Sequence, residues 1–161
     1  MVRKKGNKPK EDRKTSYMFP SLHQGVVNAV SDEIASPNFR MDDSDNAAHN
    51  RYSTNGMGTF KCNNNVCPNH GWGSKKVAIL IRGYSKSGYN AVVFNQRCKS
   101  CNKLGNLILD EKSYVDRVAY RLKKWAGVTM ERQHVAPKKG PPHESTLCEG
   151  CKRGICPKTN Y

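Results

Sequence analysis

The sequence predicts a small α+β domain, and three observations lead to this fold class. Residues 75–84 and 89–97 are rich in β-branched and aromatic side chains and are separated by a short connection, which is typical of a β-hairpin. Residues 110–127 repeat apolar side chains at three- and four-residue steps, which predicts one amphipathic helix. The 7 cysteines fall outside these elements, in three clusters at 62–67, 98–101 and 148–156.

The residues ahead of the domain are expected to form extensions. Residues 1–16 carry many lysines and arginines without apolar periodicity, which predicts a disordered basic arm. Residues 17–57 are expected to contain a short helix followed by a polar linker. Pro20 and Ser21 offer the start of this helix, and its apolar positions recur at helical spacing: Leu22, Val26, Ala29 and Val30. We expect the helix to pack on the domain; a peptide that docks on a partner is the alternative.

The main domain is expected over residues 58–157. Its hairpin turn runs from Ser85 to Gly88, and Gly88 is available for a positive φ. The open end of this hairpin would bring the first two cysteine clusters together. Asp110 can cap the following helix and Gly127 fits its C′ position. The apolar stripe of that helix consists of Val115, Val118, Leu122 and Trp125. A basic linker over 128–142 would lead to the last cluster.

The cysteines and one histidine divide evenly into two sets of four. The first set is Cys62, Cys67, Cys98 and Cys101, and the second is His143, Cys148, Cys151 and Cys156. Zinc takes four tetrahedral ligands from thiolate and imidazole, so this division predicts two structural Zn²⁺ sites, the first of them like a zinc ribbon. Disulfides are disfavoured because 7 is an odd number and because the absence of a signal peptide indicates a reducing compartment. Each zinc ion can contribute about 10 kcal/mol to folding, so the apo protein is expected to be unfolded.

Two residues near the first cluster have other expected roles. His70 lies close behind Cys67 and is expected to be free, because four cysteines already complete the first set. Trp72 is expected to pack beside the turn.

The sequence shows neither an HExxH motif nor the deaminase pattern, and it lacks a paired-carboxylate, phosphate-loop or nucleophile–base set. We therefore expect no enzyme activity and no small-molecule substrate. A thiol oxidoreductase would require a reactive cysteine that is not bound to zinc.

The charge of the chain favours a polyanionic partner. The formal net charge is +15, or about +12 once seven thiolates and two zinc ions are counted. Nucleic acid is the first expectation, although basic residues can serve solubility alone. The candidate nucleic-acid contacts are Arg117, Arg121 and Lys124 on the polar face of the helix, Tyr114 and Tyr120 beside them, and Lys152 and Arg153 in the last turn. Such rings can stack on bases while cations contact phosphates; the alternative is a solvated face with half-packed tyrosines.

Several segments together resemble the 3CxxC-type zinc-binding family, and its fungal branch most closely. They are YSTNGMGTFKC, CPNHGWGSKKVAILIR, QRCKSCNKLG, LDEKSYVDRVAYRLKKWAGV and HESTLCEGCKRGIC, with FPSLHQGVV ahead of them. The resemblance covers roughly residues 17–157. The four-residue spacing between Cys62 and Cys67 looks like the fungal form of the first pair.

This resemblance implies two kinds of function. Animal relatives include receptor-transporting proteins, which assist the export of membrane receptors, and zygote arrest proteins, whose related zinc region binds RNA. Receptor-transporting proteins often carry a membrane segment, and no apolar run here is long enough to span a membrane. We therefore expect a non-catalytic zinc protein that binds RNA in the nucleus or cytoplasm and is not secreted. The alternative is a protein-interaction adaptor or a trafficking chaperone for membrane proteins.

Overall fold

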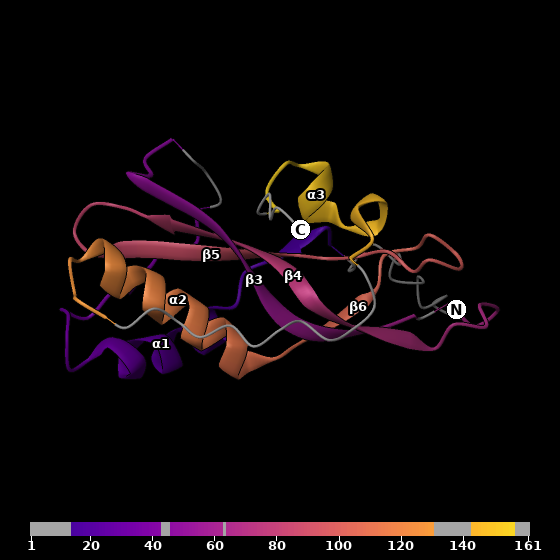
Figure 1. Ribbon diagram of the computed structural model, residues 1–161, viewed down its shortest axis with the longest axis horizontal. Helices are drawn as coiled ribbons and strands as arrows, with labels where there is room; N and C mark the ends of the chain where they lie inside the picture. Colours follow the sequence, from indigo (N-terminus) through magenta and orange to yellow (C-terminus); the bar gives the residue numbers. More distant parts are fainter. Residues whose placement is uncertain (1–13, 43–45, 63, 131–142, 157–161) are drawn as a thin grey trace, which may run out of the picture.

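The computed structural model of the 161-residue chain describes residues 14–42, 46–62, 64–130 and 143–156. They form a twisted, mainly antiparallel sheet with helices on both faces (Figure 1). The strands are β1 (Ser16–Tyr17), β2 (Asn38–Phe39), β3 (Asn50–Lys61), β4 (Gly71–Gly83), β5 (Gly88–Phe94) and β6 (Asn106–Leu109). The helices are η2 (Pro20–Leu22), α1 (His23–Val30), α2 (Glu111–Trp125), η3 (Ser145–Leu147) and α3 (Glu149–Lys152). The predicted α+β class is confirmed.

The sheet is built around an antiparallel meander of β3, β4 and β5. The strand order is β1-β5-β4-β3-β6, and β2 also pairs with β5, in parallel. β6 pairs only with the second half of β3, from Gly58 to Lys61. Because the connection between β3 and β4 lies at the end where β5 leaves the sheet, the segments carrying the first two cysteine clusters meet there.

The predicted hairpin of β4 and β5 is confirmed, but its turn differs from the expectation. The residues with positive φ are Lys86 (56°) and Ser87 (61°), not Gly88. Gly88 instead provides space, because a Cβ there would lie 3.1 Å from the Cβ of Tyr84 and 3.0 Å from the Cδ of Arg40. The glycine therefore allows the segment beside β2 to lie close against the hairpin.

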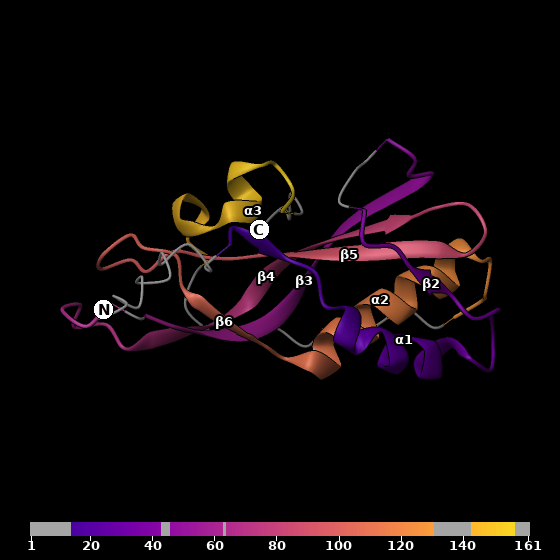
Figure 2. The same cartoon turned by 180° about the vertical axis from the view of Figure 1, so that it is seen from behind.

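Figure 2 shows α1 and α2 on one face of the sheet and α3 on the other, and a cluster of buried side chains lies on each face. One face packs against α1 and α2 in the main core, which consists of Val26, Phe60, Val77, Ile79, Ile81, Tyr89, Ala91, Val93, Tyr114, Val118 and Leu122. The opposite face carries a smaller core of Ala78, Leu80, Val92, Phe94 and Cys148. Successive strand residues point to opposite faces, so burial on both sides explains why residues 77–81 of β4 are apolar without alternation.

α2 begins and ends as its sequence predicts, whereas the expected helix start at Pro20 is the 3-10 turn η2 and α1 begins at His23. The side chain of Asp110 accepts a hydrogen bond from the backbone N–H of Ser113 at 3.0 Å, which caps α2. Gly127 follows α2 with a φ of 81°, a left-handed conformation that favours glycine. α1 lies against α2, and a Cβ at Gly25 would be only 3.2 Å from Cγ2 of Val115. The expected packing of the short N-terminal helix on the domain is confirmed.

The structure corrects the expected extent of the polar linker. β3 begins at Asn50, so residues 50–57 form the first half of a sheet strand. Most residues of this half are polar, which concealed its strand character. Ser16, at the end of the expected basic arm, belongs to β1. Residues 1–13 of that arm and residues 131–142 of the expected second linker lie outside the described residues.

Candidate metal centres

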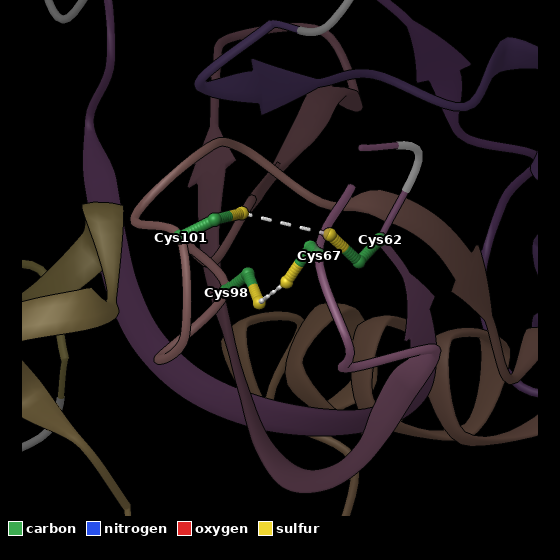
Figure 3. Close-up of side chains that lie close together, drawn as sticks. All are labelled: Cys62, Cys67, Cys98 and Cys101. Atoms are coloured by element: carbon green, nitrogen blue, oxygen red, sulfur yellow. Dashed lines mark hydrogen bonds between the residues drawn. The ribbon is translucent and has the colours of Figure 1, made fainter. Parts of the chain in front are cut away.

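The first group of predicted metal ligands meets at one end of the sheet, with the four side chains turned toward one another (Figure 3). Cys62 directly follows β3, Cys67 lies in the β3–β4 connection, and Cys98 and Cys101 lie in the turn after β5. The Sγ atoms of Cys62 and Cys101 are 3.6 Å apart, and those of Cys67 and Cys98 are 3.8 Å apart. All four sulfur atoms lie within 4.8 Å of one another. Two turns distant in sequence therefore form one four-thiol group.

The second group is built locally around α3. Cys148 is the N-cap of this short helix, Cys151 lies within it and Cys156 follows it. The Sγ atoms of Cys148 and Cys156 are 3.5 Å apart. Nε2 of His143 lies 3.1 Å from the Sγ of Cys151 and 3.8 Å from that of Cys156. The four candidate ligand atoms lie within 4.8 Å of one another, which is the grouping that the sequence predicts.

The distances within both groups fit a zinc ion and exclude disulfides. Tetrahedral zinc with Zn–S bonds of about 2.3 Å separates two ligand sulfurs by about 3.8 Å, whereas a disulfide brings them to about 2.0 Å. The Sγ–Sγ distances of 3.5, 3.6 and 3.8 Å match the zinc geometry. Each group offers the four ligand atoms of a closed structural site. The two groups are therefore consistent with two Zn²⁺ ions.

Hydrogen bonds prepare thiolates for metal binding in both groups. A backbone hydrogen bond from Lys103 lowers the pKa of the Cys101 thiol to about 6. A hydrogen bond from the Cys156 thiol lowers the pKa of Cys148 to about 4, with further help from His143 and against the effect of burial. Zinc binds the thiolate rather than the thiol. Each group thus contains a cysteine with a lowered pKa, whereas the pKa of the thiol hydrogen-bonded to it, Cys62 in the first group and Cys156 in the second, is raised.

The ligand pattern also identifies the family. The sequence pattern of the 3CxxC zinc ribbon, described as a zinc-binding domain, matches residues 55–154. The chain belongs to the 3CxxC zinc-ribbon family. No curated protein and no solved structure matches the chain. Within the described ranges, none of the helices combines the length and the apolar character that crossing a bilayer requires.

In this 3CxxC domain, α3 lies unusually close to the sheet. A Cβ at Gly150 would be 2.5 Å from the Cβ of Ala78, so a glycine is needed at this contact. The backbone N–H of Glu149 donates to the carbonyl oxygen of Asn95 at 3.1 Å. These contacts hold the second metal group beside the end of β5, directly ahead of the turn that contains Cys98.

An ion pair connects the two metal groups of the 3CxxC domain. Arg97 precedes Cys98 and donates through Nε to Oε1 of Glu149 at 2.7 Å, while its Nη1 donates to the carbonyl oxygen of Asn102 at 3.0 Å. The Glu149 side chain is only 8% exposed, and Lys152 lies 3.4 Å from its Oε1. A largely buried carboxylate depends strongly on its cationic partners. The position of α3 is therefore tied to the turn of the first metal group.

Trp72 packs beside the first metal group, as expected from the sequence. Its ring stacks on Phe60 with the centroids 5.1 Å apart, and its Nε1 donates to Oε1 of Gln96 at 3.0 Å. A Cβ at Gly105 would lie 2.8 Å from the indole, so the glycine makes room for it. His70 is exposed and lies outside the four-thiol group. The tryptophan, at the start of β4, thus joins the end of β3 to the segment after β5.

The structure does not bring the predicted nucleic-acid contacts onto one surface. α2 and α3 pack against opposite faces of the sheet (Figure 1). On α3, Lys152 lies beside Glu149, and Arg153 donates to Oγ1 of Thr15 at 2.6 Å. Tyr114 is 1% exposed and belongs to the main core, so the expectation that it could stack on a base is wrong.

The remaining residues of the α2 face meet a strand residue that sequence reasoning missed. We define the basic–aromatic cluster as Tyr52, Tyr120, Arg121 and Lys124. Cζ of Arg121 lies 3.3 Å from the ring centroid of Tyr52 and 5.9 Å from that of Tyr120, and Nζ of Lys124 lies 5.9 Å from the Tyr120 centroid. Half-buried Arg117 precedes them by one helical turn. Tyr52 could have been found only by assigning residues 50–57 to a strand.

Proposed function

We propose that this chain is a non-catalytic, zinc-stabilised RNA-binding protein that contacts RNA through the basic–aromatic cluster. The zinc ions are held by Cys62, Cys67, Cys98 and Cys101 and by His143, Cys148, Cys151 and Cys156. With four protein ligands each, these ions keep no open position for a substrate or an activated water. Their role is therefore to fix the backbone geometry on which the RNA-binding surface depends.

The proposal rests on the contacts that the two cations of the cluster make. Arg121 and Lys124 lie over tyrosine rings, and neither has a carboxylate partner among the described residues. An aromatic ring holds a cation without neutralising its charge. Both cations thus remain available for phosphates, and the neighbouring rings offer faces for bases.

Other basic side chains of the domain form ion pairs with carboxylates of the same chain. Arg97 and Lys152 contact Glu149, and Lys123, next to Lys124 on α2, lies 3.4 Å from Oε1 of Glu33. This contrast supports placing RNA at the basic–aromatic cluster rather than at α3. The formal net charge of +15 would add long-range attraction for a polyanion.

A direct test is the binding of a fluorescein-labelled, unstructured RNA of about 12 nucleotides, a length within the range that single-strand-binding domains cover. Anisotropy would be measured between about 50 and 200 mM salt, where phosphate contacts lose affinity steeply. Replacing both cations, in Arg121→Ala/Lys124→Ala, should weaken binding about tenfold or more and reduce the slope of log affinity against log salt by about 1 to 2. Lys112→Ala is the matched control, because Lys112 is an exposed lysine in the first turn of the same helix.

The same titrations separate RNA binding from the alternative role of a protein-interaction adaptor. An apolar protein interface responds little to salt, whereas release of counterions from RNA gives a steep response. Equal binding by the wild type, the double variant and the Lys112 control would refute the cluster as the contact site. Failure of the zinc-loaded wild type to bind RNA at the lower salt concentration would refute the proposed function.

A further inference from the structure

We propose that Tyr52 and Arg121 form a stacking site for an unpaired base, so that the cluster takes single-stranded RNA in preference to duplex RNA. This inference rests on the proposed function. Tyr52 lies on β3 and Arg121 on α2, and the fold brings the ring and the guanidinium together.

Tyr52 is presented at an open part of the sheet. In β3 it lies opposite Ile81 of β4, so both side chains point to the face that carries α2. Among the described residues, β6 covers the outer side of β3 only between Gly58 and Lys61. Tyr52 is 41% exposed, which is unusual for a large aromatic side chain on the helix-covered face of a sheet.

Arg121 reaches this ring from α2, and its guanidinium carbon lies directly over the ring. The distance from Cζ to the Tyr52 centroid is 3.3 Å, the separation expected of a guanidinium stacked on a ring. Its Nε is buried and has no hydrogen-bond partner within the described part of the chain. Leaving a buried donor unpaired is unfavourable, so internal hydrogen bonding does not explain this placement. The contact with the Tyr52 ring therefore sets the position of the guanidinium.

The pair suits an unpaired base better than a duplex. Aromatic rings and guanidinium planes both stack on bases, but the base must first be free of its own neighbours. The faces of bases in a duplex are covered, and a duplex would offer this site only phosphates and sugars. Tyr120, directly before Arg121 on α2, and Lys124, three residues after it, extend the surface with a second ring and a second cation. Adjacent nucleotides of a single strand can therefore alternate base and phosphate contacts along it.

The test compares one labelled RNA of about 12 nucleotides, free or annealed to its complement, at a fixed low salt concentration. The zinc-loaded full chain should bind the single strand about tenfold or more tightly than the duplex. Tyr52→Leu should weaken single-strand binding about tenfold while leaving duplex binding and the salt slope nearly unchanged, because it removes stacking and no charge. Tyr52→Phe, which keeps the ring, should restore most of the affinity. Tyr17→Leu, on β1 at the opposite edge of the sheet, is the control for a general effect of losing a tyrosine.

The outcomes separate this inference from the function on which it rests. If the wild type binds RNA but Tyr52→Leu binds the single strand as tightly as the wild type, the stacking site is wrong and RNA binding stands. Equal affinity of the wild type for single strand and duplex would likewise overturn the inference alone. If the wild type binds neither RNA, the proposed function fails as well. Two equivalents of zinc in each variant would show that a loss of affinity does not reflect a loss of fold.

Discussion

At the scale of single residues, the position of the second metal group against the sheet depends on the missing side chain of Gly150. Ala78 is fixed in the centre of the sheet, and a Cβ at Gly150 would lie 2.5 Å from its Cβ. Neither atom is the flexible end of a side chain, so the backbone of α3 would have to move. We predict that Gly150→Ala destabilises the protein by about 1–3 kcal/mol, the usual cost of overpacking. Thermal unfolding of the zinc-loaded protein, followed by circular dichroism, measures this change.

Gly73 provides the matched control for this substitution. It lies in β4, like Ala78, but a Cβ there would meet nothing within 4 Å. Gly73→Ala should therefore leave the melting temperature nearly unchanged or raise it slightly, since alanine restricts the unfolded chain. A melting temperature for Gly150→Ala equal to that of the control would show that α3 does not lie as close to β4 as the structure places it.

Residue patterns predicted the metal ligands but not the surroundings of every single residue. The eight candidate metal ligands were identifiable because cysteine spacing and zinc chemistry leave few alternatives. Tyr114 was misjudged because its helical position lies at the edge of the apolar stripe, where the sequence does not distinguish a core tyrosine from an exposed one. Gly88 was assigned to a positive φ, whereas its actual role, space for Arg40, depends on a neighbour distant in sequence.

At the scale of elements, segments with a single strong pattern were predictable. α2 has a capping aspartate, an apolar stripe and a terminal glycine, and β4 of the β4–β5 hairpin has a continuous apolar run over 77–81. The first half of β3 lacks such a pattern because its outer side is open and most of its side chains are polar. α3 is only 4 residues long, and its position is set by metal ligands and by Glu149 rather than by helical periodicity.

The ion pair between Arg97 and Glu149 should couple these elements energetically. Removing either partner leaves a charge that is partly or largely buried, so Arg97→Gln and Glu149→Gln should each destabilise the zinc-loaded protein. We expect each to cost about 1–3 kcal/mol, less than a fully buried pair, because the Arg97 side chain is 27% exposed. Denaturant unfolding of the two single variants and the double variant gives the coupling by a double-mutant cycle.

The cycle has a second readout that bears on the metal groups. Because Glu149 begins α3 and Arg97 precedes Cys98, breaking the pair should also speed the loss of zinc to a chromogenic chelator. Lys152→Gln removes the more distant partner of Glu149 and should have a smaller effect on both measurements. A coupling energy near zero, with unchanged zinc loss, would mean that the two metal groups are structurally independent.

At the scale of the whole molecule, the two zinc ions are expected to support different parts of the fold. The main core contains residues from α1, α2 and β3 to β5 and includes no candidate ligand. The smaller core contains Cys148, and Cys151, Ile155 and Cys156 pack against it. The second ion therefore holds α3 on one face, whereas the first closes the end of the meander to which both faces belong.

This difference predicts unequal consequences for one cysteine in each group. Cys151→Ser should reduce the zinc content from two equivalents to one and expose the backbone amides of 143–156 to hydrogen exchange, while α2 stays protected by the main core. Cys98→Ser should lose protection throughout β3, β4 and β5, because Cys98 is fully buried and a structural zinc contributes about 10 kcal/mol to folding. Hydrogen exchange with mass spectrometry, together with elemental analysis of zinc, measures both effects. If Cys151→Ser unfolded the domain as completely as Cys98→Ser, the two cores would form one cooperative unit held equally by both metals. The loss of either zinc ion alone would then unfold the whole domain.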